Sequence, residues 1–484
     1  MKKLLYIILA LCLLLTLAAC GPEEKPGGET TGQTEGEVVK TGNGISSSHV
    51  HCVCCGKAKG VGEHKECSDK DGWIEVGTAK ELTDAIAAAT LEAPAYVALK
   101  ADITLESDLE IIEGSDVYIC LNGKKLNTSA KNIGQLHVTD CTGNGTWTAD
   151  KNYTISNADA SVCEVYAGNF TISDKVKDTN IIVLEDNNAV FRMYGGKVYM
   201  DHESTKQGAC FLVGTLGEVH MYDGTITGAN VVLADKAADK KIGGNISLYG
   251  QSAKLYMYGG TISDGKITLP GVTGGNAAWG GNIGSVAGAM YMFGGTVTGG
   301  YANGNGGNIS TYNKSKVATF ENCTISNGTS GYFGGNFYFQ GLASDHIVNF
   351  KNAVVTGGTA ESCGGNIFIS TCTFTFDGGE LSNGKCTKEP AGGIAYQGND
   401  QMSVLKGDIK FENNYGSDLR LRKHSTGKLH YLSIKDLKTA TDIMVSAVAS
   451  YDFANDAPEN HPLKAVSGYV ITATGTKLNI KKAS

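Results

Sequence analysis

The chain has 484 residues, of which 65 are glycine and only 7 are proline, and charged residues make up 19%. The formal charge of -8 at neutral pH argues against binding to nucleic acid and against electrostatic binding to anionic lipid. Abundant glycine without proline is typical of many tight backbone turns, and it favours an all-β repeat protein over a disordered or highly charged one.

The first 20 residues, MKKLLYIILALCLLLTLAAC, have the pattern of an export signal, with two lysines, a short apolar run and small residues before Cys20. The stretch LAAC resembles the lipobox of bacterial lipoproteins, which implies removal of residues 1–19 and diacylation of Cys20. Two acyl chains suffice for stable anchoring. The alternative is a plain signal peptide, or an uncleaved anchor, with an incidental cysteine. On the lipoprotein interpretation, residues 20–48 form a flexible tether that holds the protein at the outer face of the bacterial cell membrane.

A small cysteine and histidine module is predicted for residues 49–72. C-x2-C and H-x2-C spacings there suit a closed, structural zinc site. The predicted ligands are Cys52, Cys55, His64 and Cys67. A disulfide or free thiols are the alternatives, since disulfides are possible outside the cytoplasm.

The body of the protein is predicted for residues 73–484, and it begins with one amphipathic helix over residues 79–90. Thr78 followed by Glu81 is a capping box, and apolar residues recur behind it at helical spacing. Beyond this helix the sequence predicts short β-strands, with a C-terminal cap from about 415 to 484. We expect the helix to cap the start of a β-structure.

A repeat dominates the body. One apolar position recurs every 26 to 36 residues, at Met193, Met221, Met257, Met292, Phe320, Phe350, Phe376 and Val404. Between these positions the motif GGN recurs, ending at Asn245, Asn282, Asn308, Asn336 and Asn366, with GGI ending at Ile394. Units of this length with several short strands and no helix predict a parallel β-helix, since a propeller blade needs a longer repeat. The asparagines are expected to stack as an amide ladder from coil to coil.

With these motifs the chain resembles the right-handed parallel β-helix, pectate-lyase-like superfamily, and more narrowly the GGNI-repeat surface proteins of Gram-positive gut bacteria. The fold class expected is therefore all-β, a right-handed parallel β-helix with an N-terminal capping helix. The resemblance specifies the fold and hardly specifies an activity, because that group has no single known function.

Outward aromatic residues are the candidate binding site. Six lie beside the methionine column, namely Tyr194, Tyr222, Tyr256, Tyr258, Tyr291 and Phe293. Three more follow the GGN or GGI motifs, namely Tyr338, Phe368 and Tyr396. Ring faces on a flat sheet would form a platform for sugar rings. The alternative is that neighbouring rings only stabilise the sheet.

No catalytic residue is predicted. A lyase or hydrolase would need outward carboxylates on adjacent coils, and the only such group in the repeat register is Glu321, Lys351 and Asp377. Opposite charges in one column favour ion pairing over catalysis. The sequence therefore predicts a monomeric, non-enzymatic binding or adhesion module for glycans or a surface protein. The alternatives are a polysaccharide lyase or glycoside hydrolase, and an inert spacer.

Overall fold

The computed structural model describes residues 51–52, 69–70, 73–150, 152–185, 188–234, 242–312, 317–341, 346–398, 400–424 and 426–483. All of them belong to one unit, residues 49–484. The predicted signal segment, Cys20 and the tether lie outside the described residues. No helix among the residues described has the length and apolar character needed to cross a membrane.

A single α-helix opens the body. Helix α2 (Ala79–Ile86) begins behind Thr78, whose hydroxyl accepts a hydrogen bond from the Glu81 amide at 3.2 Å. The Glu81 carboxylate in turn accepts from the Gly77 amide at 2.7 Å, so the predicted capping box is present. Leu82 and Ile86 are buried in the core. The helix is shorter than the predicted range of 79–90.

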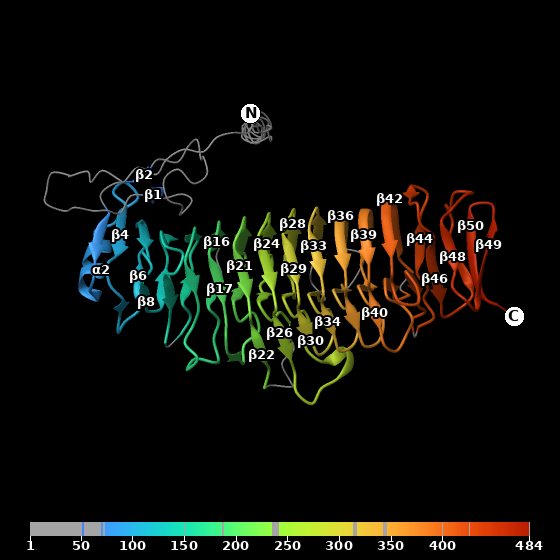
Figure 1. The fold of residues 1–484 in the computed structure, drawn as a ribbon, viewed down its shortest axis with the longest axis horizontal. Helices are drawn as coiled ribbons and strands as arrows, with labels where there is room; N and C mark the ends of the chain where they lie inside the picture. Colours follow the sequence, from blue (N-terminus) through green and yellow to red (C-terminus); the bar gives the residue numbers. More distant parts are fainter. Residues whose placement is uncertain are drawn as a thin grey trace, which may run out of the picture. The chain divides into compact units, whose positions relative to one another are not determined.

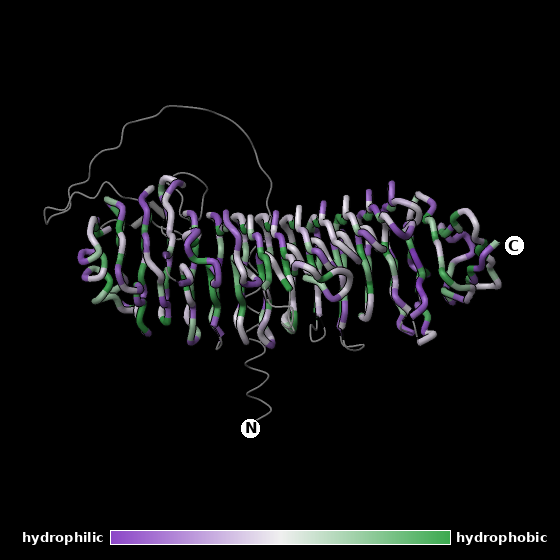
Figure 2. The backbone as a smooth tube through the Cα atoms, turned by 90° about the horizontal axis from the view of Figure 1, so that it is seen from below, coloured by the Kyte–Doolittle hydropathy of each residue, from purple (hydrophilic) through white to green (hydrophobic). Residues whose placement is uncertain are grey.

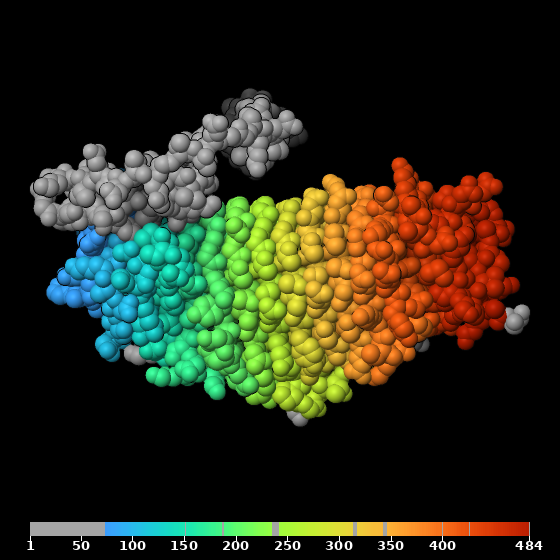
Figure 3. Space-filling view, in the orientation of Figure 1, coloured from blue at the N-terminus to red at the C-terminus, as the bar shows by residue number. Residues whose placement is uncertain are grey.

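The strands form a parallel β-helix. Apart from one two-stranded pair at residues 51–52 and 69–70, those of the described residues pair in sheets of 27, 14 and 7 strands, which we call the broad, second and third sheets. Successive coils follow one another along the chain (Figure 1). Each coil makes a band across the space-filling surface, in chain order (Figure 3). The second sheet runs from β6 (Leu109–Ile111) to β48 (Leu463–Ala465), and the third from β18 (Glu203–Ser204) to β40 (Lys385–Cys386).

The broad sheet carries the candidate site. Its front row of strands consists of β3 (Ile74–Val76), β4 (Ala95–Leu99), β7 (Asp116–Cys120), β10 (Gln135–Thr139), β13 (Val162–Val165), β16 (Val190–Met193), β20 (Glu218–Met221), β24 (Lys254–Met257), β28 (Ala289–Met292), β32 (Val317–Glu321), β36 (Ile347–Thr356), β39 (Thr373–Ser382), β42 (Met402–Glu412), β44 (Tyr431–Ser433), β47 (Tyr451–Ala454), β50 (Lys477–Lys482) and β49 (Tyr469–Thr474). A second row runs from β5 (Ile103–Thr104) to β33 (Thr324–Ser326). Pairing is parallel until β50 joins β47 and β49 antiparallel.

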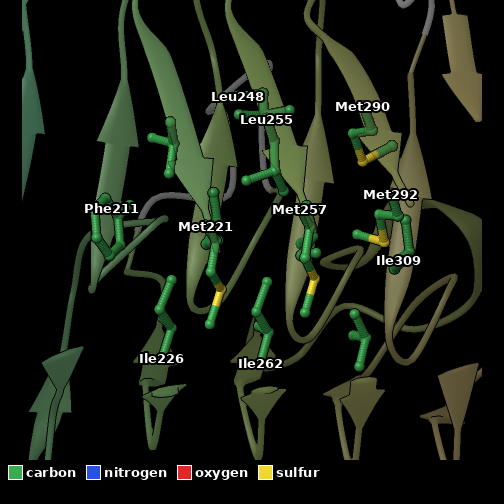
Figure 4. Close-up of a cluster of buried hydrophobic side chains, with 14 of the residues drawn as sticks. Phe211, Met221, Ile226, Leu248, Leu255, Met257, Ile262, Met290, Met292 and Ile309 are labelled. Carbon is green, nitrogen blue, oxygen red and sulfur yellow. The ribbon is translucent and has the colours of Figure 1, made fainter. Parts of the chain in front are cut away.

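The core lies inside the coils, because side chains alternate inward and outward along each strand. Hydrophobic and hydrophilic residues are correspondingly interspersed along the backbone of the coils (Figure 2). Met221, Met257 and Met292 pair in register and point inward together (Figure 4). The predicted column is confirmed as far as Phe376. It then continues to Leu405, not Val404, because Phe376 pairs with Leu405. A one-residue shift in register moves a side chain to the opposite face.

The asparagine ladder is confirmed. The side-chain amides of Asn245, Asn282, Asn308 and Asn336 each donate to the asparagine of the next coil, at 2.7 to 2.8 Å, and Asn366 ends the GGN series. All five side chains are buried. The side-chain amides form their hydrogen bonds with one another and with backbone groups, so the role of the ladder is structural.

The C-terminal cap was predicted to begin at about residue 415. Parallel pairing continues beyond that residue as far as β48, and the antiparallel strands β49 and β50 follow it. At the N-terminal side, β1 (His51–Cys52) and β2 (Asp69–Lys70) form an antiparallel pair within the predicted module. The free cysteines of the described residues are nearly all buried, as expected for small hydrophobic residues.

Candidate functional site

Two columns of rings run along the outer side of the broad sheet, and together we call them the tyrosine face. The first column lies one residue beyond the buried column of Val165 and the methionines, and it consists of Tyr166, Tyr194, Tyr222, Tyr258 and Phe293. Successive ring centroids are 5.0, 4.8, 4.9 and 5.6 Å apart, with planes inclined by 5° to 26°. The rings therefore form one continuous stack.

The second column lies two residues before the first. His220, Tyr256 and Tyr291 pair in register on β20, β24 and β28, with centroids 4.6 and 5.1 Å apart. Burial lowers the pKa of His220, and this effect outweighs the opposing influence of Glu218. The imidazole is therefore neutral at pH 7 and stacks on Tyr256 as an uncharged ring.

Stacking decides which part of each ring a ligand meets. The centroid distances match the spacing of neighbouring strands, because in-register parallel pairing places like side chains directly above one another. Each interior ring therefore has both faces covered by its neighbours. The expectation that ring faces form the contact platform is wrong for these rings: they present edges and hydroxyl groups outward.

The first column is open to solvent at its last three rings. The exposed fractions of Tyr222, Tyr258 and Phe293 are 38%, 42% and 40%. Within the described residues, the hydroxyl groups of Tyr222 and Tyr258 have no hydrogen-bond partner. Burial raises the pKa of Tyr258, and with help from Glu164 it raises that of Tyr194 to about 12. The phenols of Tyr194 and Tyr258 are therefore neutral at pH 7, and a tyrosine hydroxyl group can donate as well as accept a hydrogen bond.

The other three predicted aromatic residues do not face solvent. Tyr338 is 7% exposed and Phe368 is 1% exposed, on β35 (Phe337–Gln340) and β38 (Ile367–Thr371) of the second sheet. They do lie outside the coil lumen, but they pack with Phe333 in a small cluster of their own. The guanidinium of Arg422 lies over Phe368, 5.7 Å from the ring centroid. Their prediction as an open binding surface is wrong.

Tyr396 is inside the main core, with no exposed surface. It belongs to β41 (Ile394–Tyr396), whose Ile394 pairs with Ile367 rather than with Asn366. The GGI motif is therefore one residue out of register with GGN, and Tyr396 takes the inward position of Ile369. The prediction that it faces outward is wrong for this reason.

A charge cluster that the sequence did not predict continues the second column toward the N-terminus. We call it the His137 cluster: Asp116, His137, Glu164, Tyr166 and Arg192. The His137 Nδ1 lies 3.0 Å from Glu164 Oε2, and Nε2 lies 3.0 Å from Asp116 Oδ1. Glu164 also accepts hydrogen bonds from the Tyr166 hydroxyl at 2.6 Å and from Arg192 Nη1 at 2.9 Å.

The cluster is mostly buried, and its charges balance. The side chains of His137 and Glu164 are 8% and 13% exposed. Burial alone would lower the pKa of His137, but Asp116 and Glu164 outweigh it and hold the pKa above its usual value. Burial alone would raise the pKa of Glu164, but its three donors lower it to about 2. An imidazolium between two carboxylates fits both short distances.

This arrangement is not suited to proton transfer. Glu164 is ionised at neutral pH and its oxygens are already occupied, so it cannot act as a general acid. The cluster instead fixes the end of the tyrosine face, since Tyr166 begins the first column. A sequence signal for it exists: His137, Glu164 and Arg192 are 27 and 28 residues apart, the period of the repeat. The glycine pairs used to set the register begin only at Gly195.

Further along the face, the carboxylates are paired. Lys351 Nζ lies 3.9 Å from Glu321, and Lys406 Nζ lies 3.1 Å from Asp377. The predicted cross-strand ion pairing is confirmed, although the closest partner of Asp377 is one coil further on than Lys351. No two of these carboxylates converge on a shared space.

The predicted zinc ligands Cys55, His64 and Cys67 lie outside the described residues, as do the side chain of Cys52 and all of Cys20. Within the residues that the structure covers, no group of three or more His, Cys, Asp and Glu is arranged to hold a metal ion.

Comparison with known proteins found no matching family model, no matching curated protein and no matching solved structure. The fold and the side chains of the tyrosine face are therefore the features from which a function can be inferred.

Proposed function

We propose that this protein is a non-enzymatic binding module and that the tyrosine face is its contact surface for a glycan. The observation that carries the proposal is the continuous ring stack with exposed edges, in which the hydroxyl groups of Tyr222 and Tyr258 have no hydrogen-bond partner among the residues that the structure describes. Monomeric proteins rarely expose rows of large aromatic side chains without a use for them. A rigid parallel sheet also presents the row at little entropic cost on binding.

The regular spacing favours a polymer over a folded protein as the ligand. The tyrosine edges recur once per coil, about 5 Å apart, along the axis of the coil stack. A polysaccharide chain has a regular repeat of its own and many hydroxyl groups, so it can repeat one contact on several coils. Each such contact is weak, and several together give useful affinity.

The enzymatic alternative has no comparable support. The carboxylates in the described part of the face are ion-paired or saturated with hydrogen bonds. Incubating the protein without its first 48 residues with a polysaccharide panel, with and without calcium, separates the two. We expect retardation in affinity electrophoresis and no new reducing ends or unsaturated products. Product formation would overturn the proposal.

A double variant tests the role of the second column. We expect Tyr256→Ala with Tyr291→Ala to weaken binding to the retained polysaccharide while the melting temperature stays within a few degrees of the parent, since each cross-coil pair contributes about 0.2–1 kcal/mol. Unchanged binding with a large drop in melting temperature would mean that the rings serve only the sheet.

The N-terminal predictions complete the proposal. Cys20 would carry the lipid that holds the binding face outside the cell, and Cys52, Cys55, His64 and Cys67 would hold a structural zinc ion. Mass spectrometry of the N-terminal peptide tests the first, and metal analysis tests the second. An unmodified N-terminus, or a Cys52–Cys67 disulfide with no zinc, would refute them. Membership of the pectate-lyase-like superfamily is proposed on the repeat alone.

A further inference from the structure

The last strand of the broad sheet, β49, has one open edge. It pairs antiparallel with β50 and, in the described chain, with no other strand. The Ala483 amide donates to the Gly468 carbonyl at 2.9 Å, which fixes the phase of this pairing. Because hydrogen bonding alternates along an antiparallel pair, the N–H and C=O groups of Ile471 and Ala473 point away from β50. They have no partner among the residues described.

This edge has none of the usual protection. Edge strands commonly carry lysine, proline or a bulge that prevents another strand from adding. The sequence of β49 is YVITAT, which contains no charge and no proline, and its pairing with β50 is unbroken. Val470 is 38% exposed on the outer side. The edge can therefore accept a further strand.

The surroundings of the edge are basic. Val470 pairs with Lys481 and Thr474 pairs with Lys477, so these lysines share the outer side of the hairpin. Both are exposed, as is Lys482, and none of the three has an ion pair within the described residues. By contrast, the lysines in the middle of the broad sheet pair with carboxylates on neighbouring coils: Lys254 with Glu218, Lys351 with Glu321, and Lys406 with Asp377.

The charge of the last part of the chain agrees with this. Residues 461–484, which include β49 and β50, contain four lysines and no acidic residue, whereas the complete chain has a formal charge of -8. A strand that adds at this end would meet a positive potential, which favours an acidic partner.

We propose that β49 is a docking strand for an extended acidic peptide of another protein, which adds to the open edge as one more strand. The backbone groups of Ile471 and Ala473 supply the hydrogen bonds, and Lys477, Lys481 and Lys482 supply the charge preference. A second copy of this chain fits less well, because two such edges side by side would bring two basic ends together. The proposal is independent of the tyrosine face.

A designed peptide tests the mode of binding. The probe is a fluorescent peptide of about eight residues, long enough to cover the strand, in which glutamate alternates with valine. Anisotropy with the protein lacking its first 48 residues should show saturable binding that weakens as salt is added. We expect binding at least about tenfold weaker for the same peptide with lysine in place of glutamate, and for one with proline in place of alternate valines.

Variants of the protein locate the site. Ala473→Pro removes an outward amide without removing a hydrogen bond to β50, and it should weaken binding about tenfold or more with a near-normal melting temperature. If that variant is unstable, the double variant Lys477→Gln with Lys481→Gln tests the site instead, because it should weaken binding of the acidic peptide. The double variant Lys124→Gln with Lys131→Gln removes the same charge elsewhere and is the matched control. Binding unaffected by either change would overturn the proposal. So would a dimer of the parent protein, seen by sedimentation, that Ala473→Pro dissolves, because the occupant would then be a second copy.

Discussion

Replacing Glu164 with glutamine should destabilise the protein in a way that depends on pH. The carboxylate is 13% exposed and its pKa falls from an ordinary 4.5 to about 2. That difference corresponds to about 3 kcal/mol of stability in the ionised form. A lowered carboxyl pKa contributes stability that is present above 4.5 and is lost as the pH falls through about 2. Glu164→Gln should therefore cost about 3 kcal/mol at pH 7, and less as the medium is acidified below 4.5.

Urea unfolding at pH 7 and at two acidic pH values measures this difference, provided that the variant and parent show the same denaturant dependence. Glu321→Gln is the control, because Glu321 is 32% exposed and its lysine lies 3.9 Å away. Its cost should be below about 1 kcal/mol. Equal costs for the two variants at pH 7, or a Glu164→Gln cost that does not shrink in acid, would refute the account of the His137 cluster.

Three further predictions concern His137, the asparagine ladder and one glycine corner. The pKa of His137 is raised in the folded protein, so its stabilising contribution is complete below pH 6.5 and is lost as the pH rises through the folded pKa. His137→Gln should therefore remove this loss of stability from the pH dependence of the melting temperature. A variant whose melting temperature depends on pH as that of the parent does would contradict this prediction. Asn308→Ala removes four hydrogen bonds of 2.7 to 2.8 Å and leaves the donors of Asn282 and Gly300 without that acceptor, so it should cost about 4 kcal/mol in urea unfolding, against less than about 1 for the surface control Asn479→Ala. Gly260→Ala should lower the melting temperature, because φ is +79° and the new Cβ would lie 2.6 Å from the Met221 side chain; a melting temperature equal to that of the parent would count against this corner geometry.

Most of the architecture could be predicted from the sequence because coil repeats expose their register in single residues. Glycine pairs followed the methionine column, and each GGN placed its asparagine on the ladder, so Met257 and Asn308 were assigned correctly. The helix start was also predicted, since Thr78 and Glu81 form a local motif that needs no tertiary context.

The errors came from features that a local motif does not determine, namely strand register, covering segments and ring orientation. Tyr396 follows a GGI that pairs one residue out of step with GGN, and only strand pairing shows it. Tyr338 and Phe368 were assigned to the correct side of the sheet, but the Phe333 segment that covers them could not be placed from periodicity. The orientation of the rings was missed for a related reason: sequence shows that aromatic residues share a column, but not that their faces are in contact.

The His137 cluster was missed because the coils of Asp116, His137 and Glu164 lack the glycine pairs that set the register. His137, Glu164 and Arg192 are nevertheless spaced at the period of the repeat. In such a repeat, charged residues spaced by the length of one coil can indicate the strand register even where the glycine pairs are absent.

The most direct test of the binding face removes hydroxyl groups and leaves the ring stack intact. Tyr222→Phe with Tyr258→Phe keeps every ring, so stability should be unchanged, while two exposed hydrogen-bonding groups are lost. For a polysaccharide that the parent retains, we predict about tenfold weaker binding, from roughly 1 kcal/mol or slightly less for each hydrogen bond. Tyr415→Phe, which changes a tyrosine that is 57% exposed outside the tyrosine face, is the control and should bind as the parent does. Equal affinity of the double variant and the parent would contradict the proposal that the tyrosine face binds through its ring edges.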